Sequence, residues 1–161
     1  MAYKHSYEEY NGEKMARALG YALPVSRKQS IEICSSLRNK PLVRAKAILN
    51  DAISMRKAIP FRRFTSSISH KKGMGPGKYP INAATEILKL VENAEANAKF
   101  KGLNASNLII KHMCAQHGGN VWKAGRFRRR KMKRTHIEIV VTEGKAKKES
   151  KKKEKKEVAN K

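Results

Sequence analysis

A run of nine lysines and arginines, with no aspartate or glutamate among them, occupies residues 111–134. The cations are Lys111, Lys123, Arg126, Arg128, Arg129, Arg130, Lys131, Lys133 and Arg134, with Gly118, Gly119 and Gly125 between them. Guanidinium and ammonium groups bind phosphate oxygens through charge-assisted hydrogen bonds. At this density they repel one another unless a polyanion neutralises them. The run is too polar to enter a protein core, and it predicts a surface that binds RNA or DNA.

The segment 73–78, Gly-Met-Gly-Pro-Gly-Lys, is similar to a phosphate-binding loop but lacks its defining residues. A Walker A loop requires a glycine where Lys72 stands and a serine or threonine where Tyr79 stands. No apolar strand precedes the segment. We therefore do not expect nucleotide hydrolysis, although the backbone amides of such a loop can still approach an RNA phosphate.

Three potential metal ligands, His112, Cys114 and His117, lie within six residues of one another. Their spacing is not that of a zinc finger, and the chain contains no paired Cys-x-x-Cys. His112 and Cys114 would share one face of a strand, so a site is conceivable there, but a strand end with a buried thiol is the expected arrangement. No third group orients a Cys–His nucleophile pair, and no paired carboxylates stand out for acid–base chemistry. We predict neither a metal, nor a cofactor, nor an enzymatic activity.

Two further pairs of cations allow two interpretations: each pair could bind phosphate, or it could be an ordinary solvated part of the surface. Arg27 and Lys28 fall in the first turn of a predicted helix, where the helix dipole disfavours cations and favours an anion. Arg62 and Arg63 lie between Phe61 and Phe64, which suggests phosphate contacts beside aromatic rings. Trp122, the single tryptophan, lies in the basic run without apolar periodicity, so stacking on a base or a surface position competes with the core burial that is usual for tryptophan.

These residues require elements to position them. Apolar periodicity and turn residues predict an extended segment at 15–25, helices at 26–38, 41–59 and 82–102, an irregular loop at 60–80, and strands at 107–115 and 135–142. Ser26 with Gln29 predicts a capping box, and Asn82 is the predicted cap of the third helix. The last two strands should pair as an antiparallel hairpin whose far end is the basic run. With arms of about 12 residues, this hairpin would reach about 40 Å.

The formal charge of +24 on 161 residues is concentrated in a few segments. Residues 26–78 contain 13 basic and 2 acidic side chains, residues 111–134 contribute +9, and residues 145–161 contribute +6. Such concentrated charge favours nucleic acid as the partner. No apolar run is long enough to span a bilayer and no signal peptide is apparent, so we expect no membrane partner. With only two cysteines, we expect a cytoplasmic chain with free thiols.

Several motifs follow one another in order over residues 14–143. They are Val25-Ser26-Arg27-Lys28, Pro60-Phe61-Arg62-Arg63, Met74-Gly75-Pro76-Gly77-Lys78-Tyr79-Pro80, the run Val91 to Ala98, Lys101-Gly102-Leu103, and the basic arm closing on Thr135-His136-Ile137. Their order and spacing resemble the universal large-subunit ribosomal protein twenty-two family, called L-twenty-two in bacteria and L-seventeen in eukaryotes. The chain is most similar to the archaeal branch of that family.

The resemblance implies an α+β fold in which a small three-stranded antiparallel sheet packs with three helices and carries a long basic β-hairpin. It implies a structural constituent of the large ribosomal subunit that binds large-subunit ribosomal RNA and whose hairpin extends toward the nascent-peptide exit tunnel. Neighbouring ribosomal proteins and the nascent peptide would be further partners. We expect residues 1–143, including the hairpin at 107–142, to form the RNA-binding domain, and residues 144–161 to be a disordered lysine-rich tail.

The predicted RNA-binding residues combine the cations above with their polar and aromatic neighbours. They are Arg27, Lys28, Arg62, Arg63, His70, Lys71, Lys72, Lys78, Tyr79, Lys123, Arg126, Arg128, Arg129, Arg130, Lys131, Lys133 and Arg134. Two alternatives remain at this point: a nucleic-acid chaperone or chromatin-like protein that binds by charge alone, and an enzyme acting on RNA. An enzyme acting on RNA would need a cluster of titratable side chains, and the chain shows none. The capped helices and the alternation of apolar and polar residues in the strands favour a defined partner over binding by charge alone.

Overall fold

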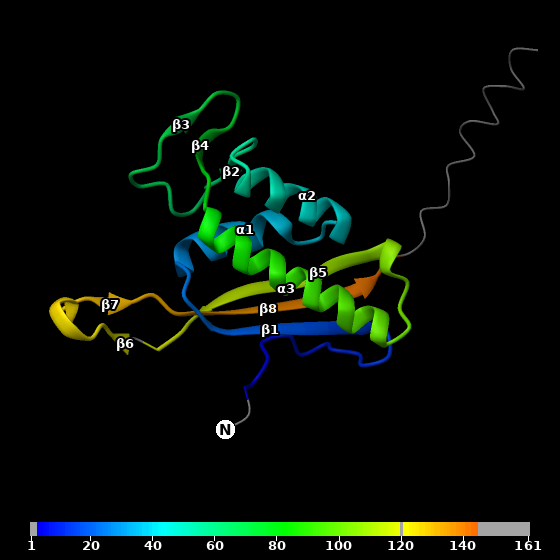
Figure 1. Cartoon of the computed structure of the whole chain (residues 1–161). Coiled ribbons are helices and arrows are strands. Elements are labelled where there is room, and N and C mark those ends of the chain that lie inside the picture. Colours follow the sequence, from blue (N-terminus) through cyan, green and yellow to red (C-terminus); the bar gives the residue numbers. More distant parts are fainter. Residues whose placement is uncertain (1–2, 120, 145–161) are drawn as a thin grey trace, which may run out of the picture.

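The computed structural model describes residues 3–119 and 121–144, which form three helices and one principal antiparallel sheet (Figure 1). The helices are α1 (Arg27–Leu37), α2 (Leu42–Ile53) and α3 (Ile81–Phe100). The principal sheet has the order β1-β8-β5, with β1 at Met15–Leu23, β5 at Leu108–His117 and β8 at Thr135–Glu143. This arrangement confirms the predicted α+β class and the three-stranded sheet.

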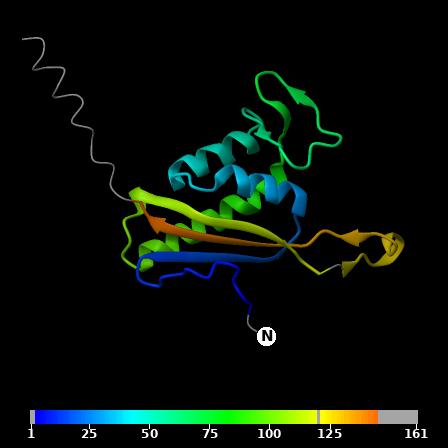
Figure 2. The same ribbon diagram turned by 180° about the vertical axis from the view of Figure 1, so that it is seen from behind.

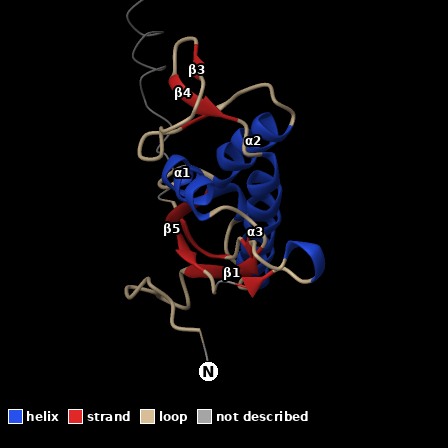
Figure 3. Ribbon diagram, turned by 90° about the vertical axis from the view of Figure 1, so that its left-hand side faces the viewer, coloured by secondary structure: helices blue, strands red, loops and turns tan. Residues whose placement is uncertain are grey.

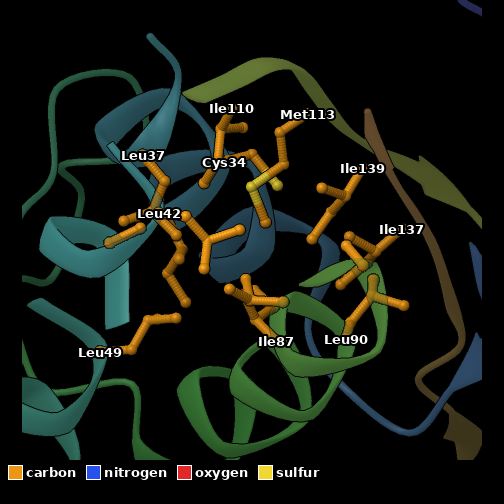
Figure 4. Packing of buried hydrophobic residues seen from close by; sticks show 14 of the residues in the cluster. Cys34, Leu37, Leu42, Leu49, Ile87, Leu90, Ile110, Met113, Ile137 and Ile139 are labelled. Atoms are coloured by element: carbon orange, nitrogen blue, oxygen red, sulfur yellow. The ribbon is translucent and has the colours of Figure 1, made fainter. Parts of the chain in front are cut away.

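The helices cover one face of the principal sheet, and the core lies between the two layers (Figure 3). Alternation along β8 directs Ile137, Ile139 and Val141 toward the helices, where all three are buried. Ile87 and Leu90 of α3 pack in the same cluster (Figure 4). Complete burial of such a side chain contributes about 1.5–3 kcal/mol, so this cluster holds the three helices on the principal sheet.

The helix boundaries differ from the predicted ones. α2 ends at Ile53 rather than just before Pro60, because its apolar stripe ends there and Met55 turns the chain with a φ of 55°. α3 begins at Ile81, and Pro80 rather than Asn82 occupies the N-cap position. Ser26 is the N-cap residue of α1, but its side chain makes no capping hydrogen bond, so the predicted capping box does not form.

Residues 60–80 are not an irregular loop throughout, as predicted, because they contribute to a second small sheet. β2 (Ile59–Pro60), β3 (His70–Lys71) and β4 (Gly75–Lys78) pair in the order β2-β4-β3. Phe61, only 4% exposed, anchors this region to the body of the protein. The turn at Gly73 and Gly75 uses positive φ angles of 72° and 78°, which glycine adopts without strain.

The two predicted strands pair as an antiparallel hairpin, β5 with β8, preceded by a short 3₁₀ turn, η1 (Ala105–Asn107). Beyond this pairing, β6 (Val121–Trp122) pairs with β7 (Lys131–Met132) around the 3₁₀ turn η2 (Gly125–Phe127). Figures 1 and 2 show β6 and β7 projecting past the end of the principal sheet. The reach of about 40 Å stays a prediction.

The predicted lysine-rich tail lies outside the described residues, apart from Gly144. Within the described part of the chain, no helix combines the length and the hydropathy needed to cross a lipid bilayer.

Candidate RNA-binding surface

The base of the projecting hairpin and the start of α1 together line a cavity of about 400 Å³. Arg27 and Lys28 enter it from α1, whereas Lys131, Lys133 and Arg134 enter it from the returning arm of the hairpin. The first amides of a helix have no carbonyl partner within that helix, so this end of α1 adds N–H groups and the positive end of a dipole. Two groups of predicted residues, about 100 positions apart in the chain, therefore form one positively charged hollow.

The hairpin base holds Arg134 in place beside this hollow. The backbone carbonyl of Arg134 accepts a hydrogen bond of 3.0 Å from the Gly118 amide. Its guanidinium Nη1 lies 3.5 Å from the carbonyl oxygen of Ala22. A Cβ on Gly118 would come within 2.8–3.0 Å of three Arg134 atoms, so only glycine lets the two arms approach this closely.

The pair Arg62 and Arg63 lies beside α1, and Phe64 links the two segments. The Arg63 guanidinium carbon is 5.4 Å from the centroid of the Phe64 ring, and Lys28 Nζ is 5.8 Å from the same centroid. Both distances fall within the range of cation–π attraction. The half-buried Phe64 ring therefore links α1 to the arginine pair, because it lies close to Lys28 of α1 and to Arg63.

Glu32 of α1 fixes the backbone of this arginine segment, and sequence reasoning missed its role. Its carboxylate accepts backbone N–H bonds from Arg62 at 3.1 Å, Arg63 at 2.8 Å and Phe64 at 2.8 Å. Burial raises the pKa of Glu32, but the three N–H donors outweigh burial and hold that pKa below its usual value. One signal was available in the sequence, since Glu32 and Asp51 are the only acidic residues between positions 26 and 78.

The hairpin tip interleaves cations with exposed aromatic rings. Lys131 Nζ lies 4.7 Å from the ring centroid of Trp122, and the Arg130 guanidinium carbon lies 5.1 Å from that of Phe127. Trp122 is 56% exposed and Phe127 is 51% exposed. Of the two alternatives for Trp122, the structure shows the surface position rather than burial in the core. Exposed rings beside cations are a common platform for stacking on bases.

The remaining predicted residues lie around the small sheet, separate from the hairpin tip in Figures 1 and 2. Lys71 Nζ is 5.4 Å from the ring centroid of Tyr79, and both side chains are half-buried. His70, Lys72 and Lys78 are exposed on the same small sheet and its turn. The structure thus brings the α1 and hairpin-base residues together and keeps this third group apart.

The side chains of the predicted RNA-binding residues form no ion pair within the described part of the chain. Fourteen of the seventeen are exposed, and Lys71, Tyr79 and Arg134 are half-buried. Within residues 3–119 and 121–144, none of the seventeen takes part in an ion pair, whereas Lys46, Lys89 and Lys99 pair with glutamates of α3. The charges of the predicted surface are available to an external anion.

The residues considered as metal ligands separate in the structure. His112 and Cys114 share the outer face of β5, as expected from strand geometry, but His117 lines the basic cavity instead. Glu138 of β8 joins the first two. Among the described residues, no carboxylate lines the basic cavity, so the chemistry that this cavity supports is anion binding.

Comparison with known proteins shows the family to which this chain belongs. Residues 18–142 match the family described as ribosomal protein L22p/L17e. The large ribosomal subunit protein uL22 of Methanosphaera stadtmanae is 41% identical over 147 residues, covering 86% of this chain and 96% of that protein. The proteins of the same name from Thermoplasma acidophilum and Methanocaldococcus jannaschii are 44% and 38% identical, covering 74% and 84% of this chain and 83% and 92% of their own lengths. The chain therefore belongs to the L22p/L17e family and is a structural, non-enzymatic protein of the ribosome.

Proposed function

We propose that this chain binds large-subunit ribosomal RNA through the seventeen predicted residues, with the cavity between α1 and the hairpin base as the principal phosphate site. The observation that carries the proposal is the convergence of Arg27 and Lys28 with Lys131, Lys133 and Arg134 around one hollow. Five cations from two distant segments repel one another when no anion is present. A phosphate backbone neutralises them and accepts hydrogen bonds from the amides at the start of α1.

Three features favour a folded RNA as the partner. The cations form separate groups on one folded body, so they suit phosphates at fixed positions better than a flexible strand. The exposed rings of Trp122 and Phe127 can stack on unpaired bases, which folded RNA offers in loops and bulges. The similarity to proteins named large ribosomal subunit protein uL22 favours large-subunit ribosomal RNA as that partner.

The projecting hairpin reaches toward the nascent-peptide exit tunnel, and the nascent peptide and neighbouring ribosomal proteins are its further partners. Support comes from the family resemblance and from the form of β6 and β7, whose side chains lie outside the core. A photo-crosslinking amino acid in place of Phe127 should capture a radiolabelled nascent chain on stalled ribosomes. The same amino acid in place of Phe100, at the far end of α3 and 94% exposed, should not.

Sucrose-gradient sedimentation of cell lysate at moderate and high salt tests the proposal against a protein that binds by charge alone. Co-migration with large subunits at one copy each, surviving a high-salt wash, is the expected result, because many simultaneous contacts resist counterion competition. A broad distribution across the gradient, or release at moderate salt, would overturn the proposal in favour of the charge-driven binder.

A further inference from the structure

The outer face of the principal sheet, opposite the helices, carries polar side chains that RNA binding does not use. His112, Cys114 and Gln116 of β5 and Glu138 of β8 lie on this face. The segment of residues 3–14 runs along the same side of the sheet, away from the helices (Figures 1 and 3). Tyr3 and Ser6 of that segment bond to Glu138, so residues from three parts of the chain meet there.

Three side chains of different chemistry converge on one point of this face. Cys114 and Glu138 are paired residues of adjacent strands, and His112 lies two positions before Cys114 on β5. The imidazole nitrogen, the thiol sulfur and a carboxylate oxygen all lie within 4.8 Å of one another. The Ser6 hydroxyl oxygen marks the point itself, at 3.2 Å from His112 Nε2, 3.2 Å from Cys114 Sγ and 2.9 Å from Glu138 Oε2.

We propose that His112, Cys114 and Glu138 bind a zinc ion at the point that the Ser6 hydroxyl marks. Nitrogen, sulfur and carboxylate oxygen are the three ligand types of zinc sites, at about 2.0–2.3 Å from the metal. Magnesium and calcium prefer sites made of oxygen ligands alone, so the thiolate selects a softer ion. The Ser6 side chain rotates outward when the ion enters. His5, whose Nδ1 is 3.9 Å from Glu138 Oε2, can supply a fourth ligand.

The hydrogen bonds around Glu138 orient its carboxylate, and Oε2 keeps a lone pair for the metal once the Ser6 hydroxyl has moved. Tyr3 Oη donates to Oε1 at 2.6 Å, and Gln116 Nε2 donates to the same oxygen at 3.1 Å. The Ser6 amide donates to Oε2 at 2.9 Å. Hydrogen bonds of this kind orient a ligating carboxylate. Glu138 is 1% exposed, whereas His112 and Cys114 are half-buried and Ser6 is exposed, so an ion can enter from the Ser6 side.

Tyr7 of the N-terminal segment lies beside His112 at the proposed zinc site. The rings of Tyr7 and His112 lie 5.2 Å apart at 31°, so Tyr7 covers one side of the imidazole. Since Tyr7 and Ser6 belong to the N-terminal segment, a bound ion would join that segment to the sheet. The spacing of His112, Cys114 and His117 in the sequence did not predict this site. Glu138 and Ser6, which complete it, are far from His112 in the sequence.

Titration of the reduced full-length protein with Co²⁺, followed by competition with Zn²⁺, tests this proposal without RNA. One Co²⁺ per chain should produce a thiolate-to-cobalt charge-transfer band, and Zn²⁺ should remove that band. Cys114→Ser should abolish the band, and His112→Ala should weaken Zn²⁺ binding about 10-fold or more. His117→Ala and Cys34→Ala are matched controls and should bind as the parent does, since neither residue belongs to the convergent group.

Two outcomes would overturn the zinc proposal. The first is the absence of a one-to-one cobalt band, which would leave the group as a purely hydrogen-bonded contact between the N-terminal segment and the sheet. The second is binding that persists unchanged in both Cys114→Ser and His112→Ala, which would place the ion elsewhere. Both variants alter half-buried side chains, and circular dichroism establishes that they are folded.

Discussion

At the scale of single residues, the most informative contact is the one between Glu32 and the backbone of Arg62, Arg63 and Phe64. The carboxylate lies in α1 and is 4% exposed, and it holds a segment that is otherwise rich in positive charge. A buried carboxylate that accepts several N–H bonds is stabilised as the anion. Glu32 therefore positions the arginine pair without being part of the predicted RNA-binding surface itself.

Replacing Glu32 with Gln should destabilise the protein by about 1–3 kcal/mol, because a neutral amide cannot accept three N–H bonds as the carboxylate does. Urea denaturation of both proteins at neutral pH measures the difference. Glu86→Gln is the matched control, since Glu86 pairs only with the exposed Lys89. Equal losses in the two variants would contradict the assigned role of Glu32.

The lowered pKa of Glu32 makes this contribution dependent on pH. Above the usual carboxyl pKa of 4.5, the folded and unfolded states are both ionised at this residue and the contribution is complete. It is lost as the pH falls through the lower pKa of the folded state. The stability difference between the parent and Glu32→Gln should therefore shrink in acid. A difference that is constant from neutral pH down to pH about 3 would argue against the lowered pKa.

At the scale of elements, the hairpin base depends on the close approach of its two arms at Gly118 and Arg134. Gly118→Ala should destabilise the fold by about 1–3 kcal/mol, because the new methyl group would overlap Arg134 backbone atoms that belong to the paired arm. Gly119→Ala is a control at the adjacent position, where a Cβ would meet no atom within 4 Å. Hydrogen exchange of the β6 and β7 amides, with thermal unfolding, should distinguish the two variants.

The packing of α3 on the principal sheet is the second feature at this scale. Ile87 is fully buried in the core, so Ile87→Ala should cost about 2–5 kcal/mol through reduced burial and a residual cavity. Val43 of α2 is 66% exposed, and Val43→Ala should change the free energy of unfolding by no more than about 0.5 kcal/mol. Chemical denaturation of both variants checks the assignment of the core face.

At the scale of the whole molecule, the residues that form the core and many of the cations lie in different parts of the chain. The core comes from α1, α2, α3 and the principal sheet, whereas the hairpin tip contributes cations and exposed rings and no buried side chain among residues 121–134. A chain with a formal charge of +24 associates with polyanions, and the salt dependence of that association reflects how many phosphates the protein neutralises.

Changing Arg128, Arg129 and Arg130 together to Ala should weaken binding to large-subunit ribosomal RNA. The slope of log K against log salt should fall by roughly one unit or slightly less for each phosphate that the variant no longer neutralises. Changing Arg56, Lys89 and Lys99 to Ala removes the same charge from residues that pair with internal carboxylates, so it should change the slope less. Filter binding over a range of salt concentrations measures both. Equal slopes for the two triple variants would mean that the tip binds no phosphate.

The sequence by itself determined the periodic features and the composition. The apolar stripe of α3, the alternation along β8 and the basic run at 111–134 follow from residue order alone, because helix and strand geometry repeat over a few residues. These patterns were sufficient for the α+β class and for a nucleic-acid partner. They misplaced the end of α2, because no proline or glycine follows Ile53 before Pro60, and they missed the second sheet, because strands of two to four residues are too short to show alternation.

Only the tertiary structure decided which surfaces meet. Arg27 joins Lys131 in one cavity, Glu32 bonds to the segment 62–64, and Ser6 reaches Glu138 across 132 positions of sequence. No local pattern encodes such meetings, since they depend on strand register and on how the helices pack over the sheet. A one-residue slip of β8 would turn Glu138 toward the core and Ile139 toward the N-terminal segment. The buried isoleucines on the opposite face prevent that slip. They therefore keep Glu138 on the outer face, where it meets the N-terminal segment.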